Sequence, residues 1–247
     1  TPACLQMCPF KALSVAGSNT EATGETVTLP HAPEAIGVPP ADSFRRPPRL
    51  SLAIRGVGGQ GNLFFGKVLA QMAFLAGYDD RNILKGETHG MAQMGGPVIS
   101  TFGCGEVFSP ALVPGTANVL IAMEKAEVLR PGFLDLLEPG GTVLMADTRI
   151  LPHGLKPEAY PSDEAIAAQL EGYRVVSVDV LSIALGLGDP KGRCANVVML
   201  GVLSTLPPFY VVPEAVWLQA LKGISRKPSL WDINHAAFMA GRGMQKD

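Results

Sequence analysis

From residue 50 onwards, the apolar and polar positions of this 247-residue chain alternate between strand-like and helix-like patterns. A short apolar run at residues 50–54 is followed by a glycine-rich segment at residues 56–61 and then by a helix-like segment at residues 62–77. Short apolar runs bounded by glycine are typical of buried strands. The order of strand, glycine turn and helix therefore predicts a first βα unit.

The same patterns predict further elements as far as the C-terminus. Strand-like segments occupy residues 97–105, 117–124, 142–146 and 173–180, and residues 106–110 are expected to extend the first of them or to pair with it as a hairpin. Helix-like segments occupy residues 125–137, 161–172, 181–188, 195–206, 213–224 and 229–244, and the first of them is expected to be broken near Pro131. Because strands alternate with helices, we predict an α/β fold: a doubly wound, mainly parallel Rossmann-like sheet with helices on both faces.

The N-terminal part of the chain has a different composition. Residues 14–48 are rich in Ser, Thr, Gly and Pro without a sustained period, which predicts an extended linker. The chain is therefore divided into residues 1–13, a linker at 14–48 and a globular domain at 49–247. Because the first residue is not Met, the sequence suggests a fragment of a longer chain or a processed product.

Residues 1–13 contain Cys4 and Cys8, spaced C-x3-C and followed by Pro9. This is the closing half of the run C-x2-C-x2-C-x3-C-P, in which thiolates ligate 4Fe–4S clusters. The segment is predicted to be the tail of a ferredoxin-like module, with Cys4 and Cys8 as metal ligands. Two ligands do not complete a cluster, so a pair of ordinary thiols is the alternative.

Composition and charge exclude several functional classes. The net charge of −2 gives no reason to expect nucleic acid or an anionic membrane as a partner. No apolar run approaches the roughly 18 residues that a membrane span needs. Cys104 and Cys194 lie in apolar surroundings and are expected to be buried and reduced, which indicates a cytoplasmic protein.

The glycine turn is the first candidate site. It contains Gly56, Gly58, Gly59, Gln60 and Gly61. Glycine tolerates positive φ and close approach, and the N–H groups of a following helix favour an anion. A dinucleotide site also needs a second strand ending in an acid roughly 20 positions later. Asp79 and Asp80 lie at that distance, but a helix precedes them, leaving no room for the strand. The remaining alternative is a closely packed turn without a ligand.

The polar, glycine-rich segment at residues 78–96 is the second candidate site. Lys85, Glu87, His89 and Gln93 lie close together in it and could perform acid–base chemistry or ligate a metal. No Cys or Asp with metal-ligand spacing lies nearby. Long ordered loops of this kind are often functional. We expect either contact with a cofactor or partner subunit, or a loop whose polar groups satisfy its own backbone.

Together, the two segments carry a family resemblance. GVGGQG at residues 56–61, a helix, and ETHGMAQMGGPVIS at residues 87–100 resemble the gamma-type domain of the 2-oxoacid:ferredoxin oxidoreductases, and within that family the small subunit that acts on indolepyruvate. The resemblance extends from about Pro48 to the C-terminus. The family pattern reads AQRGG where this chain has Met94, which puts in doubt any contact of that position with an anion.

The resemblance implies an oxidoreductase that decarboxylates indolepyruvate or another arylpyruvate, forms an acyl-coenzyme A and passes electrons to ferredoxin. Thiamine diphosphate would be held by partner domains or subunits, and 4Fe–4S clusters would carry the electrons. This chain would be a supporting component of a homo-oligomer and would supply no catalytic residue. Residues carried over as cofactor contacts are Gly56, Gly58, Gly59, Gln60, Gly61, Glu87, Thr88, His89, Gln93, Gly95 and Gly96. The alternatives are a free-standing nucleotide-binding oxidoreductase and a ligand-free dimerisation module.

Overall fold

A computed structural model describes residues 27–87, 96–151, 156–225, 227 and 230–244. Six strands form one sheet in the order β2-β3-β1-β4-β5-β6. The strands are β1 (Arg49–Val57), β2 (Ile83–Glu87), β3 (Pro97–Gly105), β4 (Ala117–Ala122), β5 (Leu137–Ala146) and β6 (Arg174–Val178). The helices are α2 (Asn62–Leu75), α3 (Asp163–Gln169), α4 (Val180–Gly186), α5 (Ala195–Leu203), α6 (Glu214–Ile224) and α7 (Trp231–Gly243).

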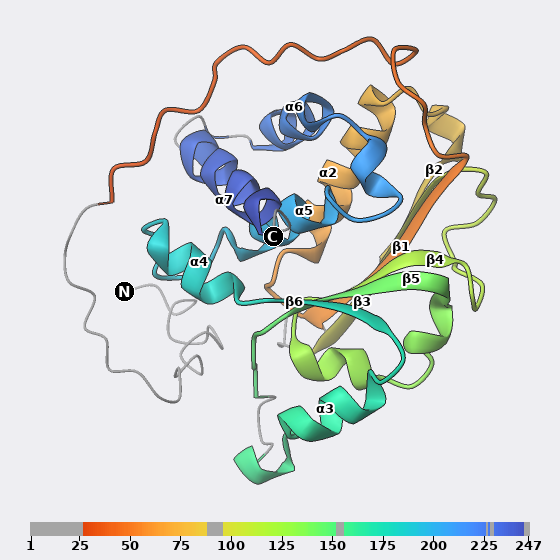
Figure 1. Ribbon diagram of the computed structural model, residues 1–247, viewed down its shortest axis with the longest axis vertical. Coiled ribbons are helices and arrows are strands. Elements are labelled where there is room, and N and C mark those ends of the chain that lie inside the picture. The colour runs from red at the N-terminus through yellow and green to blue at the C-terminus, as the bar shows by residue number, and fades with distance from the viewer. Residues whose placement is uncertain (1–26, 88–95, 152–155, 226, 228–229, 245–247) are drawn as a thin grey trace.

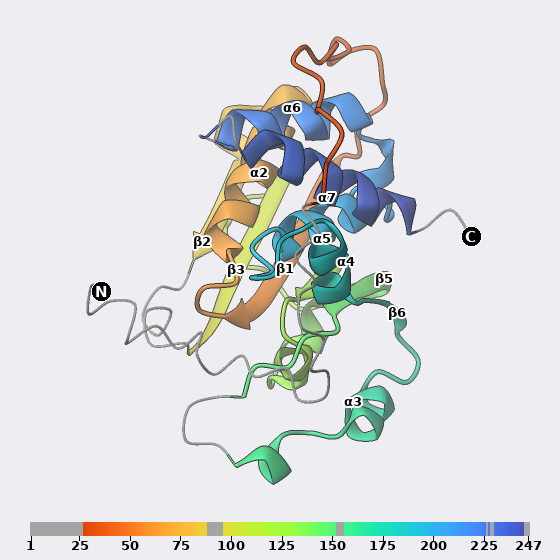
Figure 2. The same cartoon turned by 90° about the vertical axis from the view of Figure 1, so that its left-hand side faces the viewer.

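The sheet is mainly parallel, as predicted. β1 pairs in parallel with β4, β4 with β5, and β5 with β6. β3 alone runs against its neighbours, because it is antiparallel to both β1 and β2. Both faces are covered: α2, α5, α6 and α7 lie on one side and α3 on the other (Figures 1 and 2). The predicted α/β class is confirmed.

Alternate side chains of β1 enter two separate cores. Leu50, Leu52 and Ile54 face the core beneath α2, α5, α6 and α7. Ala53 faces the smaller core on the other side of the sheet. β1 is therefore covered on both faces, as a central strand should be, although Ser51 and Arg55 share the face of Ala53.

The C-terminal helices match their predictions closely. Trp217 and Leu221 of α6 and Phe238 of α7 are buried. The apolar helix α5 is buried almost all round, as its continuous hydrophobicity indicated. Ser162 caps α3 by accepting a hydrogen bond from the backbone N–H of Ala165 at 3.2 Å.

The segment at residues 125–137 is interrupted near Pro131, as predicted, but neither half is an α-helix. Two 3-10 helices stand there instead, η4 (Lys125–Leu129) and η5 (Leu134–Leu136). Arg130 between them has an extended backbone, with φ −63° and ψ 132°. A proline ring disfavours the α conformation in the residue before it, so Pro131 ends the helix rather than bending it. Residues 106–110 form no strand, and β5 begins at Leu137, earlier than predicted.

Residues 27–48 form an extended strap across the helices, coloured red to orange in Figure 1. Ala32 is buried, and its N–H donates to Asp232 of α7 at 2.9 Å. The indole N–H of Trp231 donates to the carbonyl of Pro33 at 3.1 Å. The described part of the predicted linker is therefore extended, as its composition indicated, and is also fixed to the domain.

Candidate functional site

The two segments singled out in the sequence meet at the carboxyl end of β1. The backbone N–H of Gly58 donates to the carbonyl of Gly96 at 3.0 Å. Gly96 directly precedes β3, so the start of β3 lies beside the glycine turn. Of the polar residues and glycines predicted for the second site, Lys85, Glu87 and Gly96 are described. Thr88, His89, Gln93 and Gly95, together with Cys4, Cys8 and Met94, lie outside the described residues.

Gln60 closes the glycine turn on itself. Its Oε1 accepts a hydrogen bond from the N–H of Val57 at 2.7 Å, and its Nε2 donates to the carbonyl of Met123 at 2.6 Å. The second bond ties the end of β1 to the end of β4. Gln60 is thus engaged within the fold, because its amide is bonded on both sides.

Two glycines of the turn are required by close packing. A Cβ at Gly56 would lie 2.7 Å from Oε1 of Gln60 and 2.9 Å from Cβ of Met123. Gly61 has φ +85°, and a Cβ there would overlap the side-chain amide of Asn196. Gly59 also has positive φ. These contacts support the closely packed alternative for Gly56 and Gly61 and leave the first turn of α2 as the place where a ligand could bind.

Asn62 at the start of α2 is a residue that the sequence analysis missed. It is 6% exposed, and neither Nδ2 nor Oδ1 has a hydrogen-bond partner in the described part of the chain. An unpaired buried amide is unfavourable, so such groups in native proteins call for an explanation. Here the amide lies at the N-terminus of a 14-residue helix, whose free N–H groups favour an anion. The sequence feature that could have identified Asn62 is its position as a polar residue directly after Gly61, the last glycine of the turn.

A small cavity of about 220 Å³ lies between the N-terminal regions of α2, α5 and α7. Phe64 and Asn196 line it together with Arg193, which is paired with the buried Asp189. Cys194 also lines it, and burial raises the pKa of its thiol to about 12. Cys194 is therefore a buried thiol, as predicted, and the same holds for Cys104.

Glu87 lies apart from the glycine turn, on the side of the sheet covered by α2. Its Oε1 is 3.2 Å from Nζ of Lys85 and would lie 3.7 Å from a Cβ at Gly66 of α2. The predicted grouping of Lys85 with Glu87 is therefore observed as an ion pair. Within the described ranges, no group of three or more His, Cys, Asp or Glu side chains could hold a metal ion.

The acids required by a dinucleotide site lie at the wrong end of α2. Asp79 follows the C-terminus of the helix, where it caps a 3-10 turn and pairs with Arg81 at 2.6 Å. A helix of this length spans roughly 20 Å, so the carboxylate is far from the glycine turn. No strand stands between α2 and Asp79. An acid that could bind ribose hydroxyls is therefore missing from this position.

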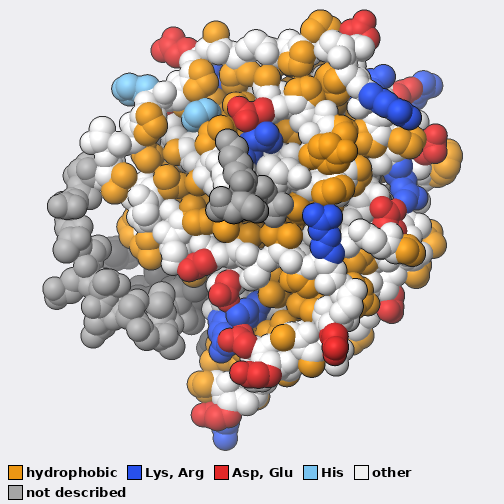
Figure 3. Space-filling model, viewed as in Figure 1, with side chains coloured by type: hydrophobic (Ala, Val, Ile, Leu, Met, Phe, Trp, Pro, Cys, Tyr) orange, Lys and Arg blue, Asp and Glu red, His pale blue; other side chains and the backbone are white. Residues whose placement is uncertain are grey.

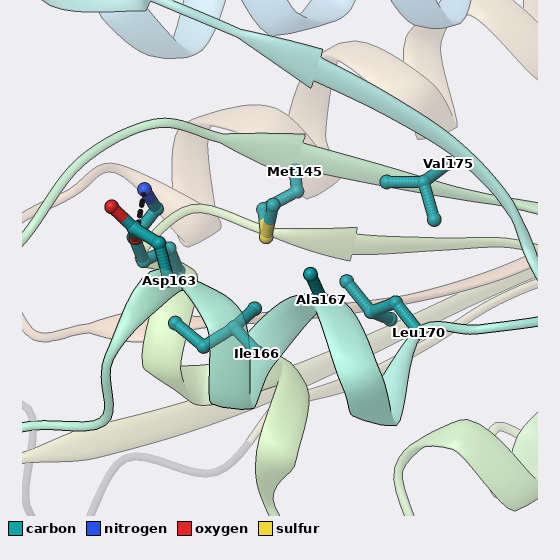
Figure 4. A pocket seen from close by; sticks show the side chains of 7 residues that line it. Met145, Asp163, Ile166, Ala167, Leu170 and Val175 are labelled. Carbon is teal, nitrogen blue, oxygen red and sulfur yellow. Dashed lines mark hydrogen bonds and ion pairs between the residues drawn. The ribbon is translucent and has the colours of Figure 1, made fainter.

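Charged groups gather where the region of α3 meets the rest of the molecule, and Figure 3 shows acidic and basic side chains side by side there. Lys125 pairs with Asp147 at 2.5 Å and with Asp163 at 2.8 Å, and Arg149 also pairs with Asp163. An apolar cleft of about 330 Å³ lies beside this cluster, between α3 and strands β5 and β6. In Figure 4, Met145, Ile166 and Leu170 line it, with Asp163 at one end, and Lys125 also belongs to its lining. The charges are satisfied by one another.

No helix in the described residues is long and apolar enough to cross a membrane.

Comparison with known proteins identifies relatives along most of the chain. Residues 51–244 match the family described as pyruvate ferredoxin/flavodoxin oxidoreductase. The indolepyruvate oxidoreductase subunit IorB of Archaeoglobus fulgidus is 35% identical over 78% of this chain and 94% of the relative. IorB of Thermococcus kodakarensis is 33% identical over 77% of this chain and 93% of the relative.

Two solved structures share the fold. The pyruvate oxidoreductase subunit PORC of Thermotoga maritima has a TM-score of 0.58 at 20% identity, over 80% of this chain and 97% of that one. The 2-oxoglutarate:ferredoxin oxidoreductase of Magnetococcus marinus, solved with 2-oxoglutarate, coenzyme A and succinyl-CoA, also has a TM-score of 0.58 at 20% identity, over 81% of this chain and 32% of that one. With its glycine turn, mainly parallel sheet and family match, the chain belongs to the pyruvate ferredoxin/flavodoxin oxidoreductase family.

Proposed function

We propose that this chain is the small, gamma-type subunit or domain of an indolepyruvate:ferredoxin oxidoreductase. The complete enzyme would decarboxylate indolepyruvate or another arylpyruvate, join the acyl group to coenzyme A and reduce ferredoxin. The observation that supports this substrate class is the 35% identity to a protein named as an indolepyruvate oxidoreductase subunit, over 94% of its length. The nucleotide-binding alternative is disfavoured by the position of Asp79.

The first turn of α2 is proposed to contact an anionic group of coenzyme A. The observation that supports this role is Asn62, whose buried amide has no partner in the described part of the fold. Free N–H groups at a helix N-terminus and an unpaired amide form a donor set that suits a phosphate oxygen. Gly96 is bonded to Gly58 of the glycine turn, and residues 87–96 are proposed to contact this co-substrate or a partner subunit.

Thiamine diphosphate is proposed to be held by partner subunits, where it would supply the carbanion chemistry. Residues 1–13, with Cys4 and Cys8, are proposed to be the tail of a 4Fe–4S ferredoxin-like module and incomplete by themselves. Residues 14–48 are proposed to link this tail to the domain at residues 49–247. Complete ligation would need cysteines from elsewhere in the assembly. The enzyme is also proposed to be cytoplasmic and to form a homo-oligomer.

The proposal is tested with the native gene product, produced anaerobically together with its thiamine-binding partners. Reduction of ferredoxin or a viologen is measured with coenzyme A and with arylpyruvates, pyruvate or 2-oxoglutarate. We expect turnover that is fastest with arylpyruvates and is lost when residues 49–247 are deleted. An assembly that carries intact clusters and bound thiamine diphosphate but oxidises none of these acids would refute the proposal.

A further inference from the structure

A nearly fully exposed phenylalanine, Phe108, lies in the loop at residues 106–116, which follows β3 at the β2 edge of the sheet (Figure 1). Its exposed fraction is 96%, the highest among the large apolar residues that the structure describes. Scattered apolar residues are normal on a protein surface. Phe108 differs from them in two respects, because the backbone on both sides of it is anchored and a cleft lies directly beside it.

The anchors of the loop are hydrogen bonds to neighbouring segments of the chain. Before Phe108, the N–H of Glu106 donates to the carbonyl of Pro48 at 2.9 Å. After it, the carbonyl of Pro110 accepts a hydrogen bond from the hydroxyl of Thr101 of β3 at 2.5 Å. The ring is therefore presented to solvent on a backbone that is already fixed, which reduces the conformational entropy lost when the ring is bound.

The cleft beside Phe108 has a volume of about 420 Å³. Pro47, Pro48 and Tyr78 supply the ring surfaces of its lining, and the hydroxyl of Tyr78 donates to the carbonyl of Pro47 at 2.8 Å. Such surfaces suit an aromatic side chain. Phe108 belongs to the lining of the same cleft. An exposed aromatic ring and a cleft that could receive one therefore lie side by side on one face of the molecule.

The cleft also carries one unpaired charge of each sign. Glu106 lines it and is exposed, with no ion-pair partner among the described residues. Arg46 lines it and donates to the carbonyl of Ala76 at 3.1 Å, but no carboxylate of the described chain pairs with it. The third charged residue of the lining, Asp79, is matched by Arg81 at 2.6 Å. The two remaining charges could be paired by a surface that carries the same two charges in the opposite order.

We propose that this surface is an isologous contact between two copies of this chain, in which Phe108 of each copy enters the cleft of the other. An isologous contact uses the same patch on both copies, so the projecting group and its receptor must lie together, as they do here. A partner of another sequence would have to supply a ring, a cleft and charges of both signs at once, whereas a second copy supplies all of them.

Each component of the patch has a separate role in this contact. Burial of the two Phe108 rings supplies the affinity. Glu106 of each copy faces Arg46 of the other across the twofold axis, which fixes the orientation of the copies. The inference deepens the proposed function by giving its homo-oligomer a contact surface, and it rests on that function only in this respect.

The experiment is sedimentation velocity of the purified full chain over a range of concentrations, which measures the monomer–dimer equilibrium. We expect Phe108→Ser to weaken dimerisation by about a hundredfold or more, because it removes two buried rings from each dimer. Asn82→Trp, which fills the cleft from an exposed position in its lining, should have a similar effect. The control is Val113→Ser, which removes an apolar residue, 64% exposed, from the same loop but outside the lining and should leave dimerisation unchanged.

A mixture of the two interface variants tests whether the contact is reciprocal. Phe108→Ser retains an open cleft and Asn82→Trp retains the ring, so a dimer formed from one copy of each has one of the two contacts. We expect the mixture to dimerise more strongly than either variant by itself. Thermal unfolding identifies the variants that remain folded, and Phe108→Ser is expected to fold because the side chain it replaces is exposed.

Three outcomes would overturn the contact. They are a wild-type chain that stays monomeric at about 100 μM, a dimer that Phe108→Ser and Asn82→Trp leave unchanged, and a mixture that dimerises no more strongly than its components. Because the chain is measured without other subunits and without turnover, none of these outcomes bears on whether the assembled enzyme oxidises 2-oxoacids. Failure of the enzyme assay would likewise leave the contact standing.

Discussion

Two buried asparagines provide a sharp test of the α2 site. Asn62 and Asn118 are each 6% exposed. Asn118 accepts from the N–H of Ser51 at 2.8 Å and donates to Oε1 of Glu138 at 2.6 Å. Asn62 has neither kind of bond within the described residues. Replacing each by alanine should therefore change stability in different directions.

The magnitudes follow from the hydrogen bonds. Asn118→Ala removes both bonds and leaves the N–H of Ser51 without this acceptor, so it should reduce the free energy of unfolding by about 1–3 kcal/mol. Asn62→Ala removes an unpaired amide, which relieves a penalty of similar size, and alanine favours a helix by roughly 0.5 kcal/mol. The small void left behind offsets part of this gain. The net expectation is a chain that is more stable by about 0–2 kcal/mol.

The assay is urea and thermal unfolding of the full chain with and without each substitution. Turnover of the assembled enzyme is then measured. Each kcal/mol corresponds to about 2–4 °C in Tm for a domain of this size. In the assembly, Asn62→Ala should raise the KM for coenzyme A while the fold remains intact. A loss of stability as large as that of Asn118→Ala would show that Asn62 is bonded internally and would refute the reasoning. An unchanged KM for coenzyme A would show that Asn62 does not contact this ligand.

Three further predictions concern the glycine turn, the buried Glu124 and the strap at residues 27–48. Gly61→Ala should reduce the free energy of unfolding by about 1–3 kcal/mol in urea titrations, because it combines φ +85° with overlap on Asn196. Burial raises the pKa of Glu124 in the folded chain. Its contribution to the free energy of unfolding is therefore full at a pH below the pKa of the unfolded chain and is lost as the pH rises through the pKa of the folded chain. Glu124→Gln should flatten this dependence of stability on pH, and an unchanged dependence would contradict the prediction. Asp232→Ala removes the bond to the N–H of Ala32, so limited proteolysis should cleave the strap sooner, whereas an unchanged cleavage rate would contradict its role.

The order of elements could be read from the sequence because it depends on local patterns. The apolar run of β1, the glycine turn and α2 follow one another along the chain, and their periodicity and glycine content are visible there. The serine cap of α3 and the burial of α5 could also be predicted, because they depend on single residues and on the continuous hydrophobicity of one segment. The break near Pro131 was also visible in the sequence, since the residue before proline avoids the α conformation. That the two halves are 3-10 helices was not.

The chemistry of the candidate site was decided by tertiary contacts. Gln60 looked like a ligand-binding residue, yet its amide is bonded to Met123, which lies 63 positions away in the chain. Asn62 and Asn118 are the same residue type with the same burial, and only their partners distinguish an unpaired amide from a satisfied one. The ion pairs of Glu127 likewise need Arg55 from β1 beside Arg130. The sequence by itself determined the βα framework and the family, because these follow from local spacing. The role of each polar group depends on which distant groups satisfy it, and only the folded chain brings those groups within hydrogen-bonding distance.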